Sequence, residues 1–456
     1  TGTLTLEGIN TYTGGTTVSK GTLDTTGGGE LADTGAVTVD GSGIYTVGTA
    51  DAIGVLDNSG TVNVNQDLTA TDITGAGGLA IANTQTLTAD NANPSTYSGI
   101  ISGDGGLTKT GTGNLTLTGT NTYSGGTTVS AGTLTGDTDS LQGGITNDAT
   151  VTFDQGGPGI YAGDMDGTGT LVKLNTGNVT LGGNNSYTGG TTVTGGTLTG
   201  DTDSLQGNIS NSATLTFDQG VAGTYSDVIS GSGNLVKNSG GDVTFSGTNT
   251  YTGATQINAG TLSLGGNNVL SDFTAVTVSG GTFDLAGNID TVGSIAGGGN
   301  ITLGSGALTA GGDNSSTTFS GVISDTGSFT KEGTGTLTLT GANTYTGGTT
   351  VSAGTLDTTG GGTLENTGAV TVGGSGTYTV GTADTIGVLD NSGMVNVDQD
   401  LTASDITGAG GLAINSSTTL TAVNTTNDST YSGIISGGGG LTKTGGQKLT
   451  LQGNNT

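Results

Sequence analysis

The chain has 456 residues, of which only 9 % are charged, and it contains no Cys, His or Trp. Its seven basic residues, all Lys, are outnumbered by 36 acidic residues, giving a net charge of −29. Without Cys or His the chain cannot form disulfides, thiolate metal sites or the usual nucleophilic triads. The excess of negative charge argues against nucleic acids and anionic membranes as partners.

The 96 glycines and the many Thr, Val and Asn residues disfavour helices, since these residue types are poor helix formers. Apolar residues instead alternate with polar ones in short runs, as in Leu4-Thr-Leu6 and Leu115-Thr-Leu117. An alternation of period two predicts short strands with one buried face. No apolar run approaches the roughly 20 residues that a membrane-spanning helix requires.

One motif recurs along the chain, beginning with GTLTLEGINTYTGGTTVSKGTL at 2–23 and returning at 113–134, 177–198, 241–262 and 335–356. Its marker residues are an Asn and a Tyr two positions later: Asn10 and Tyr12, Asn121 and Tyr123, Asn185 and Tyr187, Asn249 and Tyr251, Asn343 and Tyr345. The sequence that follows Tyr12 returns almost exactly after Tyr345. We therefore predict one continuous repeat array over 1–456, in which a superunit spanning 1–333 repeats from 334. Its subunits begin near residues 1, 112, 176, 240, 334 and 446. Because the chain begins and ends inside a repeat, we expect it to be a segment of a longer protein.

A second element precedes the internal motifs, as in SGIISGDGGLTKTG at 98–111. It places a lysine at equivalent positions: Lys109, Lys173, Lys237, Lys331 and Lys443. We interpret each of these lysines as a single charge that blocks strand-edge pairing or reduces repulsion among the acidic residues. The alternative is a row of binding residues.

Short strands separated by Gly, Asn, Asp and Ser, with no room for crossover helices, can bury their apolar faces only by stacking coil on coil. The sequence thus predicts an all-β solenoid of about 20 rungs, each about 20 residues long, that forms a rod on the order of 100 Å. Asn and Thr at equivalent corners are expected to stack as ladders. The direction of the marker tyrosines stays open, and flat β-meanders or a string of β-sandwich domains are the alternatives.

Pairs of acidic residues are the candidates for catalytic or metal-binding sites. Asp137/Asp139 and Asp201/Asp203 lie in the repeated string TGDTDSLQG, and Asp164/Asp166 forms a third pair. Paired carboxylates can hydrolyse sugars, but an active site would occur once, whereas a repeated pair indicates turn chemistry. We predict no catalytic residue and no cofactor, and keep Ca²⁺ at Asp137, Asp139, Asp201 and Asp203 as a weak alternative.

The unit G-[TN]-[LV]-T-L-x-G-x-N-[TS]-Y-[TS]-G-G-T-T-V-x-x-G-T-L resembles the passenger-associated β-strand repeat of autotransporters and related bacterial adhesins. The resemblance implies a right-handed, single-stranded parallel β-helix at the surface of a Gram-negative bacterium. It also implies that a secretion signal and a translocator barrel belong to the parent protein. Family members include adhesins, self-associating proteins and some enzymes.

We therefore predict a non-enzymatic structural segment of an extracellular or cell-surface fibre, acting as a rigid rod in adhesion or self-association. The expected partners are other copies, neighbouring repeats, cell-surface glycans or partner cells, with no nucleic acid and no membrane insertion. A glycan- or cell-binding surface along the rod is the alternative, and a polysaccharide-active enzyme is a remote one.

Overall fold

The computed structural model describes residues 2–364 and 368–456, and all regular elements in these residues are β-strands. No helix in these ranges is long and apolar enough to span a membrane. The described residues form about 22 turns of a parallel β-solenoid, which confirms the predicted fold class.

The length of a coil follows from the strand register. Strand β11 (Gly106–Lys109) pairs in parallel with β8 (Thr86–Ala89) on one side and with β13 (Thr127–Val129) on the other. In these pairs Leu107 lies opposite Leu87 and Thr127. One turn of the chain therefore runs from Leu87 to Leu107 and the next from Leu107 to Thr127, which is the coil length that the sequence predicts. Other coils are shorter or longer: Leu134 lies opposite Val151, whereas Leu79 lies opposite Ile101.

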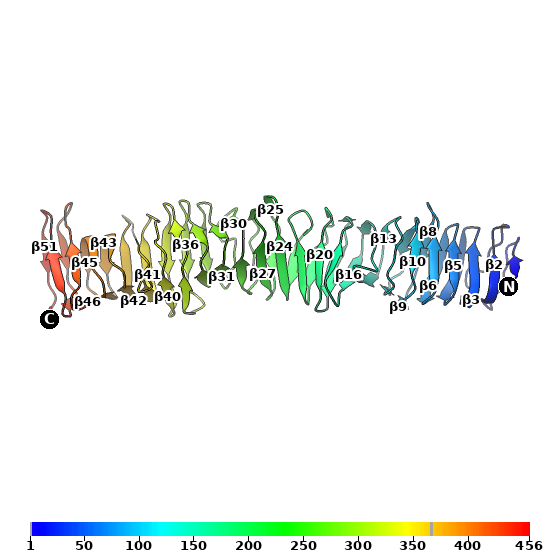
Figure 1. Cartoon of the computed structure of the whole chain (residues 1–456), viewed down its shortest axis with the longest axis horizontal. Helices are drawn as coiled ribbons and strands as arrows, with labels where there is room; N and C mark the ends of the chain where they lie inside the picture. The colour runs from blue at the N-terminus through cyan, green and yellow to red at the C-terminus, as the bar shows by residue number, and fades with distance from the viewer. Residues whose placement is uncertain (1, 365–367) are drawn as a thin grey trace. The chain divides into compact units, whose positions relative to one another are not determined.

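The chain divides into two compact units, Thr1–Leu215 and Thr216–Thr456. In the first unit, β2 (Thr16–Asp24) pairs with β3 (Val37–Val47), and β4 (Asp51–Asn58) pairs with β6 (Leu68–Gly75). Shorter strands such as β12 (Asn114–Leu117), β14 (Thr133–Gly136) and β16 (Thr150–Asp154) follow at successive coils. Within this unit the coils stack in chain order, from β2 through β16 in Figure 1.

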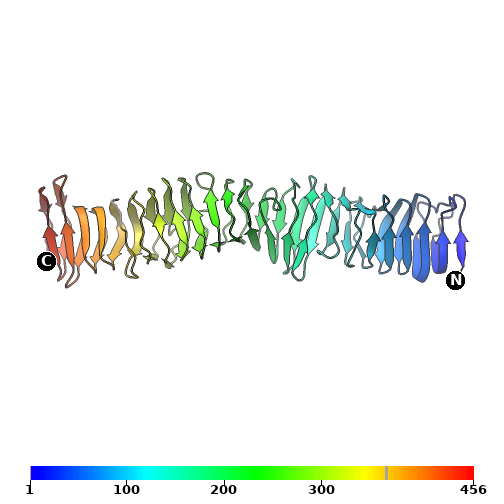
Figure 2. The ribbon, with the colours of Figure 1, turned by 45° about the horizontal axis from the view of Figure 1, so that its top comes forward.

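The second unit is built in the same way. Strand β36 (Ala307–Ala310) lies between β33 (Ile289–Val292) and β39 (Ser328–Lys331), and β39 pairs with β41 (Thr349–Asp357). Long strands return at β42 (Val370–Val380), β43 (Asp384–Asn391) and β45 (Leu401–Gly408). Figure 2 shows these coils one after another within the unit.

The repeated sequence reproduces even an irregularity of the backbone. The pairing of β2 with β3 shifts register between Val18 and Lys20, and the pairing of β41 with β42 shifts between Val351 and Ala353. Strands β2 (TTVSKGTLD) and β41 (TTVSAGTLD) have the same sequence except at Lys20 and Ala353, so the two shifts occupy equivalent positions. The same local sequence therefore specifies the same bulge twice.

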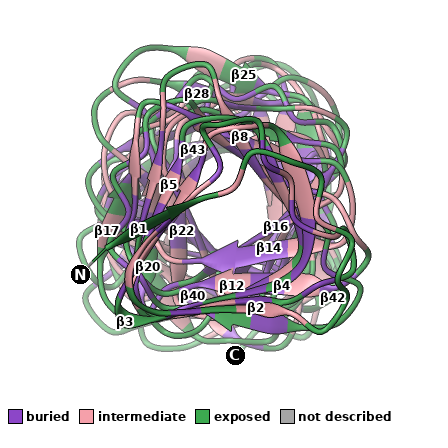
Figure 3. Ribbon diagram, turned by 90° about the vertical axis from the view of Figure 1, so that its right-hand side faces the viewer, coloured by how far each residue is buried: buried purple, intermediate pink, exposed green. Residues whose placement is uncertain are grey.

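The interior of each unit is lined by alternate strand residues. In β12, Leu115 and Leu117 are buried whereas Asn114 and Thr116 are only partly buried, and Figure 3 shows the buried residues on the inner side of the coils. Glycine is required where a positive φ coincides with close approach of the preceding coil. Gly75 has a φ of 105°, and a Cβ there would lie 2.1 Å from the carbonyl oxygen of Asn58 on the preceding coil. A side chain at this position would therefore force neighbouring coils apart.

Candidate functional site

The marker asparagines face inward and join three successive coils. The side-chain oxygen of Asn121 accepts a hydrogen bond from the backbone N–H of Ile101, 2.8 Å away on the preceding coil. Its amide nitrogen donates to the carbonyl oxygen of Ser140, 2.7 Å away on the following coil. The contacts recur at Asn185, Asn249 and Asn343. The marker asparagines bond to backbone and not to one another because successive markers, such as Asn121 and Asn185, lie several coils apart.

The marker tyrosines are also internal. Tyr123 is 2 % exposed, and its hydroxyl hydrogen-bonds the hydroxyl of Thr127, 2.7 Å away. Tyr187, Tyr251 and Tyr345 are buried in the same way, each with the Thr four residues later. Tyr12 makes the equivalent bond to Thr16 at 2.8 Å but is 46 % exposed. These contacts support a structural role for the markers.

Four of the five equivalent lysines are buried, so the interpretation that they block strand-edge pairing is wrong for these four. Lys237 is fully buried, and its ammonium donates to the carbonyl oxygens of Asn238 at 2.7 Å, Ser239 at 2.8 Å and Ala259 at 3.0 Å. We call this three-carbonyl arrangement the lysine cradle. It recurs at Lys109, Lys173 and Lys331, whereas Lys443 is exposed and reaches two carbonyls.

The cradle explains how a charge is tolerated inside the coil. An ammonium has three donors, and three carbonyls satisfy all of them. Two carbonyls come from the turn that follows the lysine and the third from the next coil, so the side chain fixes a corner of one coil to the corner of the next. Burial lowers the pKa of Lys237, while the carboxylates of Asp242 and Asp218 act in the opposite direction.

Buried aspartates also join neighbouring coils, which the sequence analysis did not predict. Asp384 is 7 % exposed, and one of its carboxylate oxygens accepts a hydrogen bond from the N–H of Leu364 at 2.7 Å. The carbonyl of the same peptide unit, that of Thr363, accepts from Asn343 at 3.0 Å. We call this arrangement the Asn–peptide–Asp bracket. In a second instance, Asn10 and Asp51 bond the peptide between Glu30 and Leu31. In a third, Asn249 and Asp290 bond the peptide between Val269 and Leu270.

The carboxylate of each bracket is wholly or partly buried, away from solvent. Asp290 is fully buried, and this burial raises its pKa to about 6, although N–H groups of Leu270, Val269 and Thr291 oppose the shift by bonding to the charged form. The pKa of Asp51 is raised for the same reason. Burial also raises the pKa of Tyr97, to about 12.

The repeated acidic pairs lie in turns. The carboxylate of Asp137 accepts from the N–H groups of Asp139 at 3.1 Å and Ser140 at 2.8 Å, and the hydroxyl of Ser140 accepts from the N–H of Asp137. Asp201 and Asp203 adopt the same turn with Ser204. This geometry supports the turn interpretation.

The third acidic pair is also tied to the backbone, since Asp164 accepts from the N–H of Asn184 at 2.8 Å. Over residues 2–364 and 368–456 no group of three or more acidic side chains is arranged to hold a metal ion. Calcium binding at Asp137, Asp139, Asp201 and Asp203 stays a prediction, and a thermal midpoint that does not change with EDTA would contradict it.

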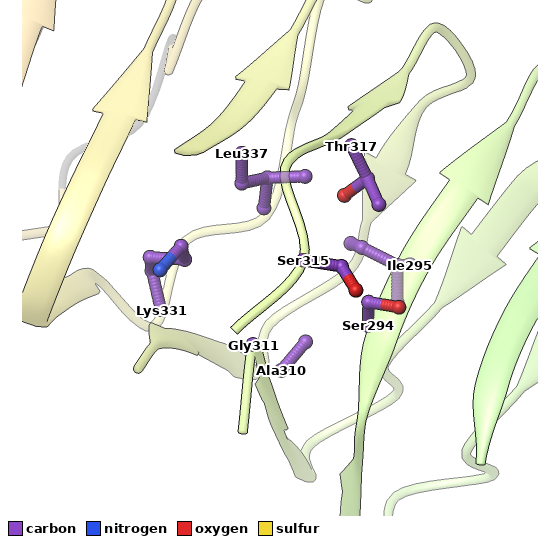
Figure 4. Close-up of a pocket in the computed structure, with 8 residues that line it drawn as sticks. All are labelled: Ser294, Ile295, Ala310, Gly311, Ser315, Thr317, Lys331 and Leu337. Carbon is purple, nitrogen blue, oxygen red and sulfur yellow. The ribbon is translucent and has the colours of Figure 1, made fainter. Parts of the chain in front are cut away.

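One small cavity in the second unit lies beside a lysine cradle (Figure 4). Ser294, Ser315 and Thr317 lie on one side of it, with Lys331 and Leu337 on the other. Its volume is about 10 Å³, which is about the space that one water molecule needs. The cavity is therefore too small for a substrate or cofactor.

Comparison with known proteins places these side chains in a recognised repeat. The family model for the passenger-associated-transport-repeat matches residues 1–24, 107–135, 171–199, 235–264, 329–357 and 441–456. Each of the four complete internal matches contains a cradle lysine and an Asn–Tyr marker pair.

The chain is 32 % identical over 441 residues to a protein described as the Adhesin BmaC autotransporter of Brucella suis biovar 1 (strain 1330). The match covers 78 % of this chain, and the chain spans 12 % of the length of that relative. No solved structure matches the chain.

Proposed function

Since the chain belongs to the autotransporter passengers built on passenger-associated transport repeats, we propose that it is a rigid structural segment that holds adhesive surfaces away from the cell. This membership agrees with the predicted extracellular or cell-surface location. It also favours a structural or adhesive role over an enzymatic one.

The rigidity of each unit is supported by its ladders of parallel strands. Backbone hydrogen bonds join each coil to the next, and an apolar stack of residues such as Leu87 and Leu107 fills the interior. In such a solenoid each coil contacts only its neighbours, so stiffness depends on every junction between coils.

The buried polar side chains carry this proposal, because they reinforce those junctions. Asn249 bonds backbone groups of the coils before and after its own, and Lys237 bonds carbonyls of its own coil and the next. A polar group at these sites that lost its partner would cost about 1–3 kcal/mol. Sliding one coil against another would therefore break several costly contacts at once.

Adhesion is supported by the relative, which is described as an adhesin. We propose that this chain likewise contacts cells or other surfaces through its outward-facing residues. Purified chain coupled to beads tests this: binding to bacterial or host cells above that of beads carrying an unrelated protein of equal negative charge is expected. Binding equal to that control would contradict the adhesive role.

Self-association is the other proposed role of the outward-facing surface. Apolar side chains that are exposed within the units, such as Ile160 at 68 % and Val221 at 79 %, are the observation that favours it. Sedimentation velocity over a range of concentrations should then reveal oligomers. A single monomeric species at every concentration would contradict self-association and leave the adhesive role standing.

A further inference from the structure

We propose that an open groove on the flank of the second unit binds an uncharged, extended glycan. The groove has a volume of about 550 Å³, within the range of ligand sites in proteins. It runs across successive coils and is lined by residues that share one corner of the solenoid: Asn267, Asn288, Ile289, Ser305, Ala307, Thr326 and Ser328, with Gly287, Gly306, Gly327 and Gly347. This inference rests on the proposed adhesive function and gives it a site and a ligand class.

The groove follows the direction in which the coils stack. Ile289 at the start of β33 lies opposite Ala307 at the start of β36, which in turn lies opposite Ser328 at the start of β39. These residues occupy the same place on three neighbouring coils, about 4.8 Å apart. A linear polymer lying along the groove would therefore meet a similar set of groups at each coil.

Glycines let the corner pack closely along this line. A Cβ on Gly327 would lie 2.3 Å from the carbonyl oxygen of Gly306, and one on Gly347 would lie 2.5 Å from that of Gly327. Both distances are too short for a side chain, so the coils at this corner approach each other backbone to backbone. The side chains beside the glycines then form the walls of the groove.

The chemistry of those walls suits a sugar. Ser305 and Thr326 are exposed, and Ser328 is half-buried. The hydroxyls of Ser305 and Ser328 take part in no hydrogen bond among the described residues, which leaves them free for a ligand. Ile289 is 53 % exposed and offers an apolar surface against which the C–H face of a sugar ring can pack. Hydroxyl groups beside an exposed apolar side chain match the mixed polar and apolar surface of a pyranose, whereas the amide of Asn288 already donates to the carbonyls of Leu264 and Leu285.

The negative charge of the chain favours uncharged glycans over anionic ones. None of the residues that line the groove is charged, but the exposed Asp325 adjoins Thr326 and the chain as a whole has a net charge of −29. A polyanionic glycan would be repelled by this field, whereas an uncharged one would not. Uncharged polysaccharide is therefore the ligand class that we assign.

The test compares the purified chain with two variants on an array of uncharged oligosaccharides, including β-1,4-linked glucose and mannose oligomers, and anionic glycosaminoglycans. Ala307→Trp fills the centre of the groove and should reduce binding of uncharged oligomers at least tenfold. Ala413→Trp is the matched control, because Ala413 is also a half-buried residue of a four-residue strand in the same unit, β46 (Gly411–Ile414), and lies outside the groove. It should bind as the unaltered chain does.

A milder variant guards against misfolding. Ser305→Ala together with Ser328→Ala removes two hydroxyls without adding bulk, and weaker binding by about 5- to 150-fold is expected from the loss of two hydrogen bonds. The inference is overturned if the unaltered chain binds no uncharged oligomer, or if Ala307→Trp binds as tightly as Ala413→Trp. Chain-coated beads that still adhere to cells in either case would show that the adhesive function stands and that the groove does not serve it.

Discussion

Asn343 and Asp384 bind opposite ends of the same peptide unit. The amide of Asn343 donates to the carbonyl of Thr363, and the carboxylate of Asp384 accepts from the N–H of Leu364, so one peptide bond on the middle coil is bonded by side chains of the coils on either side. The carbonyl of Thr363 also accepts from the backbone N–H of Asn343 at 3.1 Å, so the side chain of Asn343 adds a second bond to it. Three coils are thereby joined through a single peptide.

Removing the asparagine from this bracket should loosen the coils locally. Asn343→Ala leaves the N–H of Ile323 without its side-chain partner, while the carbonyl of Thr363 keeps the backbone N–H at position 343. A loss of about 1–3 kcal/mol in unfolding free energy is expected. Hydrogen exchange followed by mass spectrometry should show faster exchange at Ile323. Asn427→Ala is the control, because Asn427 is exposed, and it should leave the exchange pattern unchanged. Equal effects of the two variants would contradict the bracket.

The lysine cradles predict which amines react in the folded chain. Lys109, Lys173, Lys237 and Lys331 are buried, whereas Lys20, Lys443 and Lys448 are exposed. Brief acetylation of the native chain should modify the three exposed lysines and leave the four cradle lysines unmodified until the chain is unfolded. Peptide mapping by mass spectrometry measures this directly. Rapid modification of Lys237 in the native state would contradict the cradle.

Replacing a cradle lysine should destabilise its unit. Lys331→Met leaves the carbonyls of Glu332, Gly333 and Ala353 without their donor, so a loss of about 2–5 kcal/mol is expected. Lys448→Met, at an exposed position, should change stability by less than about 0.5 kcal/mol. Urea unfolding of the two variants provides the comparison, and an equally stable Lys331→Met chain would show that the cradle contributes nothing.

Asp290 should make the stability of the second unit depend on pH. Its pKa is raised to about 6 in the folded state from an ordinary value of 3.8, so folding binds a proton between these values. The resulting stabilisation is fully present below about pH 4 and is lost as the pH rises through 6. The difference in thermal midpoint between the unaltered chain and Asp290→Asn should therefore change between pH 4 and pH 7. A constant difference would contradict the raised pKa.

Alkali should unfold the chain through its buried tyrosines. Burial raises the pKa of Tyr97 to about 12, above the ordinary value of 10, so the stabilisation is present below pH 10 and is lost as the pH rises through 12. Phenolate absorbance should appear together with the loss of β-sheet circular dichroism. Ionisation of all tyrosines near pH 10 with the fold intact would contradict their burial.

Much of this architecture follows from local sequence. Alternation in runs such as Leu115-Thr-Leu117 predicts inward-facing leucines, and the repeat spacing predicts coils of about 20 residues; the structure has both, although single coils are shorter or longer. The same alternation carried a signal for the lysines: Lys109 lies two residues after the buried Leu107 and therefore on the inward face. The interpretation as strand-edge charges was wrong because it relied on residue type alone and omitted the three carbonyls that make burial of an ammonium tolerable.

The bracket aspartates were harder to predict. Asp384 and Asn343 are distant in the sequence, and only the stacking of the coils brings them to the same peptide. Their side chains resemble those of the many exposed aspartates and asparagines in turns. Local patterns predict the face on which a residue lies, whereas the partner across a coil depends on the exact number of residues in each turn.

The most direct test of the proposed role is display of the chain on the surface of a non-adherent bacterium, fused to a translocator, with the translocator alone as the control. Adhesion of these cells to one another or to host cells is the measurement, and lysine acetylation confirms that the displayed chain is folded. The account predicts that cells displaying the folded chain adhere more than the controls. Folded chain on the surface with adhesion equal to that of the controls would contradict it.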